Sequence, residues 1–144
     1  MIKVKKMTSY LIQNAMIYPI TRPPFKGDVL IKDGKINNVQ FKIQPTGEEQ
    51  VINGEGQYLF PGLIDVHTHL GLYDEGTGWA GNDANETSEM ITPHIIAMDG
   101  VYPLDIAFSD DFAAGITCVH VMPGSANIIG GTTSVIKTVG KDIK

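Results

Sequence analysis

The most informative stretch of this sequence spans residues 60–70 and reads FPGLIDVHTHL. Its apolar and β-branched residues predict a β-strand over residues 63–70. On a strand, side chains two residues apart point to the same face and lie roughly 6.6 Å apart along the chain. His67 and His69 would therefore present two imidazoles side by side, which suits one shared metal ion. Two histidines with this spacing also occur by chance, so the spacing alone does not establish a metal site.

The chain before this stretch is predicted to form short strands separated by turns. Residues 10–18 are one strand candidate. Residues 29–31 lead into Asp33-Gly34, a strong two-residue hairpin signal, and residues 35–43 return as the partner strand. No helical periodicity appears in this part of the chain. Residues 1–60 are therefore expected to form a small antiparallel sheet assembly, part of a β-sandwich.

The chain after this stretch alternates between strand and helix. A loop of about 31 residues, 71–101, separates the strand over residues 63–70 from a helix predicted over residues 102–114. A second strand follows over residues 116–122. Strand, helix and strand make a βαβ unit, so the two strands should be parallel. A loop of this length is usually functional or disordered.

The helix prediction depends on residues at its two ends and on one apolar stripe. Pro103 and Asp105 suit a first helical turn, and Gly115 suits a stop after the last turn. The apolar stripe recurs every four residues, at Leu104, Phe108 and Phe112. This spacing predicts one apolar face on the helix.

Other polar residues on the two strands have structural alternatives. By strand parity Asp65 shares the face of His67 and His69 and could support the site as a hydrogen-bond acceptor, although a structural hydrogen bond fits equally well. Cys118 and His120 share a face of the second strand. A buried thiol and a packed core histidine are the favoured interpretations for these two.

The loops after the two strands carry polar residues of their own. His94 is interpreted as a surface or substrate-loop residue rather than as a ligand. The glycine-rich run after residue 122 does not match a phosphate-binding loop, because Gly131 rather than lysine follows Gly130. The acidic residues of the long loop lack the spacing of an EF-hand, and a solvated loop is expected. They are Asp74, Glu75, Asp83, Glu86 and Glu89.

Composition excludes several classes of partner. Eleven basic and sixteen acidic residues give a net charge of −5, which does not fit a nucleic-acid surface. Cys118 is the only cysteine, so no internal disulfide can form, and this fits a reducing compartment. No apolar run is long enough to span a membrane or to act as a signal peptide. A cytoplasmic protein without a membrane partner is expected.

The stretch over residues 60–70 resembles the signature of the amidohydrolase superfamily, Pro-Gly-hydrophobic-hydrophobic-Asp-x-His-x-His after a β-rich segment. Further segments resemble the imidazolonepropionase-related branch of that superfamily. They are Asn85-Glu86-Thr87, Ala114-Gly115-Ile116-Thr117, Pro123-Gly124-Ser125-Ala126-Asn127 and Gly130-Gly131-Thr132. The resemblance spans essentially the whole chain.

The resemblance implies an α/β fold with an all-β N-terminal part. Residues 1–60 would form a partial β-sandwich, and residues 61–144 the first βαβ unit of a TIM-type (β/α)₈ barrel. A complete barrel needs about 250 residues, so a truncated barrel, an N-terminal fragment, is expected. Open sheet edges lead us to expect either self-association or cover by a missing C-terminal portion. A stand-alone β binding module over the first sixty residues fits less well, because no linker separates it from the barrel motif.

The resemblance also implies a function. Metal-activated water would hydrolyse a non-peptide C–N bond in a small-molecule substrate such as a cyclic amide, an amidine or an N-acyl compound. His67 and His69 are the implied metal ligands, with zinc preferred over iron, manganese or nickel and with one or two ions in the complete enzyme. The other ligands and the acid/base residue come from later strands in that family. No catalytic residue is therefore expected within this chain, the substrate-binding residues are unassigned, and the fragment alone should be inactive.

A non-catalytic function is the alternative. Some relatives in the amidohydrolase superfamily have lost metal ligands and serve as assembly proteins. The presence of both His67 and His69 argues against that alternative here.

Overall fold

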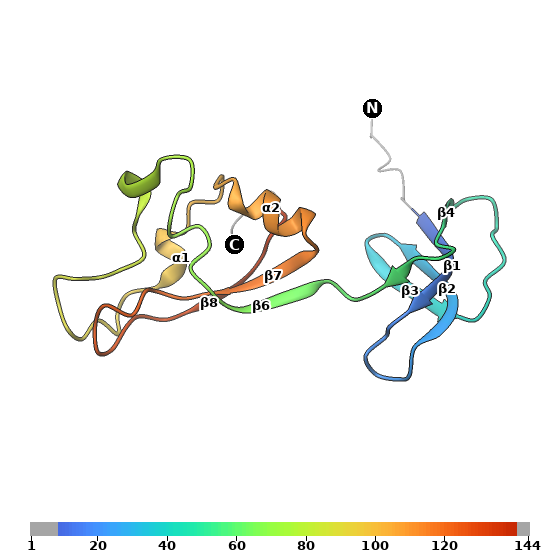
Figure 1. Ribbon diagram of the computed structural model, residues 1–144, viewed down its shortest axis with the longest axis horizontal. Coiled ribbons are helices and arrows are strands. Elements are labelled where there is room, and N and C mark those ends of the chain that lie inside the picture. The colour runs from blue at the N-terminus through green and yellow to red at the C-terminus, as the bar shows by residue number, and fades with distance from the viewer. Residues whose placement is uncertain (1–8, 141–144) are drawn as a thin grey trace, which may run out of the picture. The chain divides into compact units, whose positions relative to one another are not determined.

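The computed structural model describes residues 9–140 of the chain and is drawn in Figure 1. It divides into two compact units, an N-terminal unit that ends at Pro61 and a C-terminal unit that begins at Gly62. Each unit is built on a sheet of its own. No helix in the described part of the chain is both long and apolar enough to cross a membrane.

The N-terminal unit contains a five-stranded sheet. Its strands are β1 (Ser9–Ile17), β2 (Phe25–Lys32), β3 (Lys35–Gln40), β4 (Gln50–Asn53) and β5 (Tyr58–Leu59). They are arranged in the order β3-β2-β1-β4, and β5 also pairs with β1. β2 runs antiparallel to both β1 and β3, whereas β4 and β5 run parallel to β1. The prediction of an antiparallel assembly is therefore wrong for β4 and β5. Residues 41–49 form a long connection rather than a hairpin turn, and this returns the chain beside β1 in the same direction.

The turn between β2 and β3 is the predicted hairpin. Asp33 and Gly34 have φ angles of 52° and 73°, and a type I′ turn requires positive φ at both central residues. The returning strand is shorter than predicted, because β3 ends at Gln40 instead of continuing to residue 43. The N–H of Ile43 donates to the carboxylate of Asp28 at 2.8 Å.

The core of the N-terminal unit includes one buried carboxylate. Its apolar members are Leu11, Ala15, Ile17 and Val29. Asp28 is also buried and accepts hydrogen bonds from the backbone N–H groups of Asn14 and Ile43, both at 2.8 Å. Because each carboxylate oxygen has a backbone donor, burial leaves neither oxygen without a hydrogen bond.

The C-terminal unit contains a three-stranded sheet in the order β6-β7-β8. Its strands are β6 (Leu63–Thr68), β7 (Ile116–Val121) and β8 (Ser134–Lys137). β6 and β7 are parallel, as predicted, and helix α2 (Ala107–Ala113) lies between them in sequence and packs beside β7 (Figure 1). β8 runs antiparallel to β7 and is not predicted from the sequence. Its four residues, Ser-Val-Ile-Lys, do not alternate between apolar and polar, so they give no strand pattern.

Helix α2 begins later than predicted. The sequence predicts a helix over residues 102–114, but the preceding residues form separate turns, and Asp105 Oδ1 accepts a hydrogen bond from the N–H of Ala107 at 3.1 Å. The predicted stop is confirmed, since Gly115 has a φ of 90° directly after the last turn. The predicted apolar face is wrong in part. Phe108 is buried, whereas Leu104 precedes the helix and is 78% exposed.

The long loop after β6 is packed and ordered by several short elements. It includes the 3₁₀ turn η1 (Gly78–Gly81) and the short helix α1 (Ala97–Gly100). Its apolar side chains join Phe108, Val119 and Val121 in the core of the C-terminal unit. The loop residues in this core are Leu72, Ala84, Ala97 and Val101. The loop therefore supplies four of the seven buried residues of this core.

Candidate metal centre

His67 and His69 lie at the carboxyl end of β6. His67 is the last but one residue of the strand, and His69 follows the strand directly. Their ring centres are 5.8 Å apart, and their ring planes are inclined at 83°. Zn–N bonds of about 2.1 Å would place the centres of two imidazoles on one tetrahedral ion about 5 Å apart. The separation of the two ring centres is therefore close to that of two imidazoles on one divalent ion.

The strand that carries the histidines is not regular. Asp65 pairs with Val119 and Thr68 pairs with Val121, so three steps on β6 lie opposite two steps on β7. The extra residue is a β-bulge, a feature that re-aims side chains near functional sites. The prediction that His67 and His69 share a face assumed a regular strand, but β6 is irregular between Asp65 and Thr68. His67 lies within the bulge and His69 lies directly after the strand, and their rings are nevertheless close together.

The Asp65 carboxylate bonds to a backbone N–H group rather than to the imidazole ring of either histidine. Its Oδ1 atom accepts a hydrogen bond from the N–H of His67 at 3.0 Å. Of the two roles open to Asp65 from the sequence, this is the structural hydrogen bond. This hydrogen bond nonetheless holds the backbone N–H group of His67 itself.

The ring of His69 is held by the end of the neighbouring strand. Its Nδ1 atom is 2.6 Å from the carbonyl oxygen of Met122, the residue after β7. A carbonyl oxygen only accepts, so Nδ1 carries the proton and the lone pair on Nε2 is free. Met122 also donates its N–H to the carbonyl of Thr68 at 3.0 Å, which fixes the two strand ends together. Metal-binding histidines commonly have this arrangement, with the second ring nitrogen bonded to a carbonyl.

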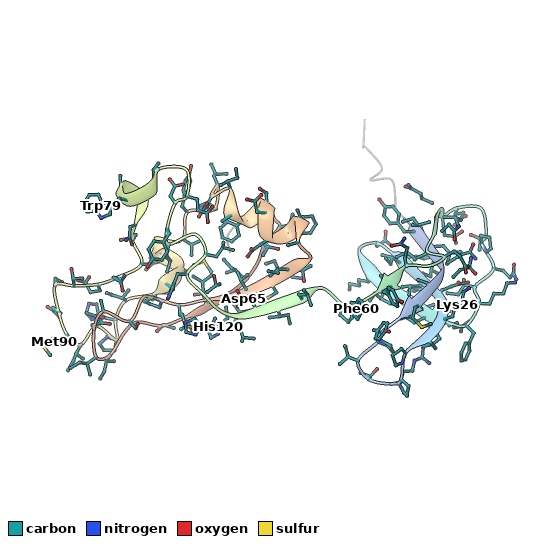
Figure 2. The ribbon with its side chains drawn as sticks, in the orientation of Figure 1. Lys26, Phe60, Asp65, Trp79, Met90 and His120 are labelled. Carbon is teal, nitrogen blue, oxygen red and sulfur yellow. The ribbon has the colours of Figure 1, made fainter. Side chains whose placement is uncertain are left out.

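His120 is not the packed core histidine that the sequence favours. It is half-buried on β7, and both of its ring nitrogens are bonded. Nδ1 lies 3.1 Å from the carbonyl oxygen of Val66, and Nε2 lies 2.7 Å from the hydroxyl of Thr133. Cys118 on the same strand is half-buried as well. Figure 2 shows Asp65 and His120 at neighbouring positions of the β6–β7–β8 sheet.

A pocket of about 390 Å³ opens between the two loops that follow β6 and β7. Its polar lining includes Asp83, Glu86, His94 and Asp99 from the first loop and Asn127 from the second. His94 is exposed, which confirms the interpretation of a surface residue, and it lines this pocket. Hydrogen bonds from Ser88 lower the pKa of Glu86, and the nearby His94 lowers it further.

Backbone hydrogen bonds join the two loops around the pocket. Gly124 N–H donates to Ala84 O at 2.6 Å, and Thr92 N–H donates to Ile129 O at 2.8 Å. Asn127 also bonds to the hydroxyl of Thr92. Thr92 and Asp99 were not predicted as pocket residues, and Asp83 and Glu86 were expected in a solvated loop. Single polar residues in a long loop give no local pattern that indicates a shared pocket.

Comparisons with known proteins found both similar sequences and a similar solved structure. No family model matches it. Amidohydrolase tasK of Hapsidospora irregularis is 39% identical over 115 residues, 77% of this chain and 12% of that protein. D-hydantoinase of Geobacillus stearothermophilus is 43% identical over 67 residues, 46% of this chain and 14% of that protein. The crystal structure of an amidohydrolase from Thermotoga maritima matches with a TM-score of 0.84 and 44% identity over 91% of this chain. The homologues of this chain are amidohydrolases.

The chain spans a small part of these amidohydrolases. It corresponds to 12% of the length of tasK and to 34% of the Thermotoga chain. Within residues 9–140, no cluster of three or more His, Cys, Asp or Glu side chains is placed to hold a metal ion. His67 and His69 therefore form a candidate pair of ligands without a third His, Cys, Asp or Glu beside them in the described part of the chain.

Proposed function

We propose that this chain forms part of a metal-dependent hydrolase that cleaves a C–N bond other than a peptide bond in a small-molecule substrate. Its relatives include an amidohydrolase and a D-hydantoinase. The observation that carries the proposal is the close pair His67 and His69. The bond from His69 to Met122 leaves Nε2 of that ring available to a metal ion.

His67 and His69 are the proposed ligands of a divalent metal. Imidazole suits zinc, our first choice, and also iron, manganese or nickel. When bound, such an ion lowers the pKa of water and polarises the carbonyl group of the substrate. Catalytic zinc has three protein ligands, so we propose that further ligands, and a second ion if there is one, belong to other parts of the complete enzyme.

The pocket is the proposed binding region for the substrate. Its lining includes Asn85, Glu86, Gly124 and Asn127. These residues belong to segments that resemble the imidazolonepropionase-related branch, which supports a place for the chain in that branch. A cyclic amide, an amidine or an N-acyl compound is the substrate class that we infer. The lone thiol supports a cytoplasmic location.

We also propose that β6, α2 and β7 are the first βαβ unit of a (β/α)₈ barrel and that the N-terminal sheet is part of a β-sandwich. Active sites in such barrels lie at the carboxyl ends of the strands. The two histidines lie at that end of β6, and the pocket is formed by the loops that follow β6 and β7. Their common location supports the barrel assignment.

Calorimetric titration with zinc tests the metal assignment. We expect the 144-residue chain to bind zinc weakly, because two protein ligands leave the remaining positions of the ion to water. A His67→Ala/His69→Ala double variant should lose this binding, and His94→Ala should retain it. Equal zinc binding by the parent and the double variant would show that these histidines are not the ligands.

An activity assay tests the proposal that the 144-residue chain carries only part of the active site. We expect no turnover of amide or lactam substrates by the 144-residue chain, since two ligands without a general base leave the catalytic machinery incomplete. Metal-dependent hydrolysis that persists through purification and disappears in the double variant would contradict this expectation.

A further inference from the structure

The peptide unit between Val66 and His67 is held by two side chains. Its N–H group, from His67, donates to Asp65 Oδ1 at 3.0 Å. Its carbonyl group, from Val66, accepts from Nδ1 of His120 at 3.1 Å. Both polar groups of this peptide are therefore bonded to side chains.

The β-bulge explains why side chains are needed at this point. The pairing of β6 with β7 passes from Asp65–Val119 to Thr68–Val121, and neither Val66 nor His67 has a paired residue on β7. His120 is the residue of β7 that lies between these two pairs. Its imidazole supplies a donor to the Val66 carbonyl at the point where the pairing of β6 with β7 is interrupted.

The ring of His120 is fixed from its other side as well. Nε2 lies 2.7 Å from the hydroxyl of Thr133, the residue directly before β8. A ring bonded at both nitrogens has little freedom to rotate. His120 thus connects the bulge of β6 through β7 to the start of β8.

We propose that His120 is a positioning residue for the metal ligand His67. Through the carbonyl of Val66 it sets the plane of the peptide from which the side chain of His67 projects, while Asp65 holds the opposite side of the same peptide. The inference rests on the proposed function, in which His67 and His69 hold a metal ion. His120 itself touches neither the ion nor the substrate in this role.

Three substitutions separate positioning from a general contribution to stability. His120→Leu removes both ring bonds. His120→Asn places an amide nitrogen close to the position of Nδ1 and keeps a donor for Val66. Thr138→Val is the matched control, because the hydroxyl of Thr138 donates to Ile116 O at 2.8 Å at the far end of the same sheet.

Two properties are measured for the parent and for each variant of the 144-residue chain. Titration gives the zinc affinity, and NMR without metal gives the exchange rate of the His67 amide hydrogen. We expect His120→Leu to weaken zinc binding by about tenfold or more, as loss of a supporting partner of a metal ligand does, and to speed exchange of the His67 amide. His120→Asn should recover most of both properties. Thr138→Val should leave both unchanged, even where it lowers the midpoint of unfolding.

Three results would overturn the inference: parental zinc affinity in His120→Leu, equal losses in His120→Asn and His120→Leu, or an equal loss in Thr138→Val. If His120→Leu does not fold, His120→Ala takes its place, because it also removes both ring bonds, and the same weaker zinc binding is expected. Unchanged zinc binding in the His67→Ala/His69→Ala variant would refute the metal site instead. Exchange of the His67 amide would still report whether His120 fixes that peptide.

Discussion

The Nδ1 atom of His69 and the carbonyl oxygen of Met122 are 2.6 Å apart, although 53 residues separate them in sequence. This hydrogen bond connects the residue after β6 with the residue after β7. It orients one proposed ligand from the backbone of the neighbouring strand, so the ring does not depend on a second polar side chain. The orientation of His69 therefore follows from the parallel pairing of β6 with β7.

The first prediction concerns the tautomer of His69. Because the Met122 carbonyl accepts from Nδ1, we expect neutral His69 to carry its proton on Nδ1 and to leave Nε2 unprotonated. Two-bond ¹H–¹⁵N correlation spectra at alkaline pH distinguish the two tautomers, and His94 is an exposed reference in the same spectrum. Addition of zinc should shift the Nε2 resonance of His69. A proton found on Nε2 would contradict the proposed mode of metal binding.

The second prediction concerns the close contact between the two pocket loops. A Cβ atom at Gly131 would overlap the carbonyl oxygen of Ile95. That carbonyl also accepts from Thr132 N–H at 2.7 Å and is not free to move away. We expect Gly131→Ala to lower the free energy of unfolding by about 1–3 kcal/mol, measured by urea denaturation with circular dichroism.

The neighbouring glycine provides the control for this substitution. A Cβ atom at Gly130 would have Asn127 Oδ1 as its nearest neighbour at 3.6 Å, an ordinary van der Waals distance. Gly130→Ala should therefore cost much less than Gly131→Ala. Equal losses would mean that the loops are not fixed against each other at Ile95.

Features encoded by adjacent residues were predictable from the sequence. Asp33-Gly34 specifies its turn because positive φ at two successive positions is a local requirement. Gly115 ends α2 for the same kind of reason. The parallel pairing of β6 and β7 followed from a general rule for βαβ units. These predictions needed no knowledge of distant contacts.

Features that depend on distant partners were not predictable. The parallel position of β4 beside β1 depends on the path of a loop, and β8 is identified through its pairing with β7. In the site, the spacing of His67 and His69 predicted that the rings would be close. It did not predict the bulge or the Met122 carbonyl, because a backbone acceptor has no signature in the side chains of a sequence.

The third prediction concerns the pH dependence of stability. Burial raises the pKa of Asp111 on α2, and the neighbouring carboxylates of Asp65 and Asp110 raise it further. A raised pKa in the folded state means that the folded chain binds this proton more tightly than the unfolded chain does. The resulting stability is fully present below the ordinary pKa of an aspartate and is lost as pH rises through the raised value. Ionised Asp111 is therefore unfavourable at neutral pH.

We expect Asp111→Asn to stabilise the fold at pH 7 and to lose this advantage as the pH falls to about 4. The gain should stay below about 1 kcal/mol, because solvent screens a carboxylate that is largely accessible. Urea denaturation at several pH values measures it. Glu48→Gln removes one negative charge from an exposed position and serves as the control. A gain that does not change with pH would contradict the assigned cause.

The last prediction concerns the free edge of β6. Within residues 9–140, β6 pairs with β7 alone. Three of its side chains are apolar and exposed, with Leu63 at 58%, Ile64 at 63% and Val66 at 70%. Unpaired strand edges beside exposed apolar surface recruit other chains. We therefore propose that the 144-residue chain associates with itself through this edge, in a manner that depends on concentration.

Light scattering coupled to size-exclusion chromatography over a dilution series tests this proposal. Ile64→Lys should shift the chain toward the monomer, because a lysine on an edge strand opposes pairing with another edge. Ile36→Lys is the matched control, since Ile36 is 71% exposed on β3, the edge strand of the other sheet. If Ile36→Lys dissociates the chain as well as Ile64→Lys does, the contact is not specific to β6. A parent that stays monomeric at every concentration would show that the edge of β6 does not recruit a second copy.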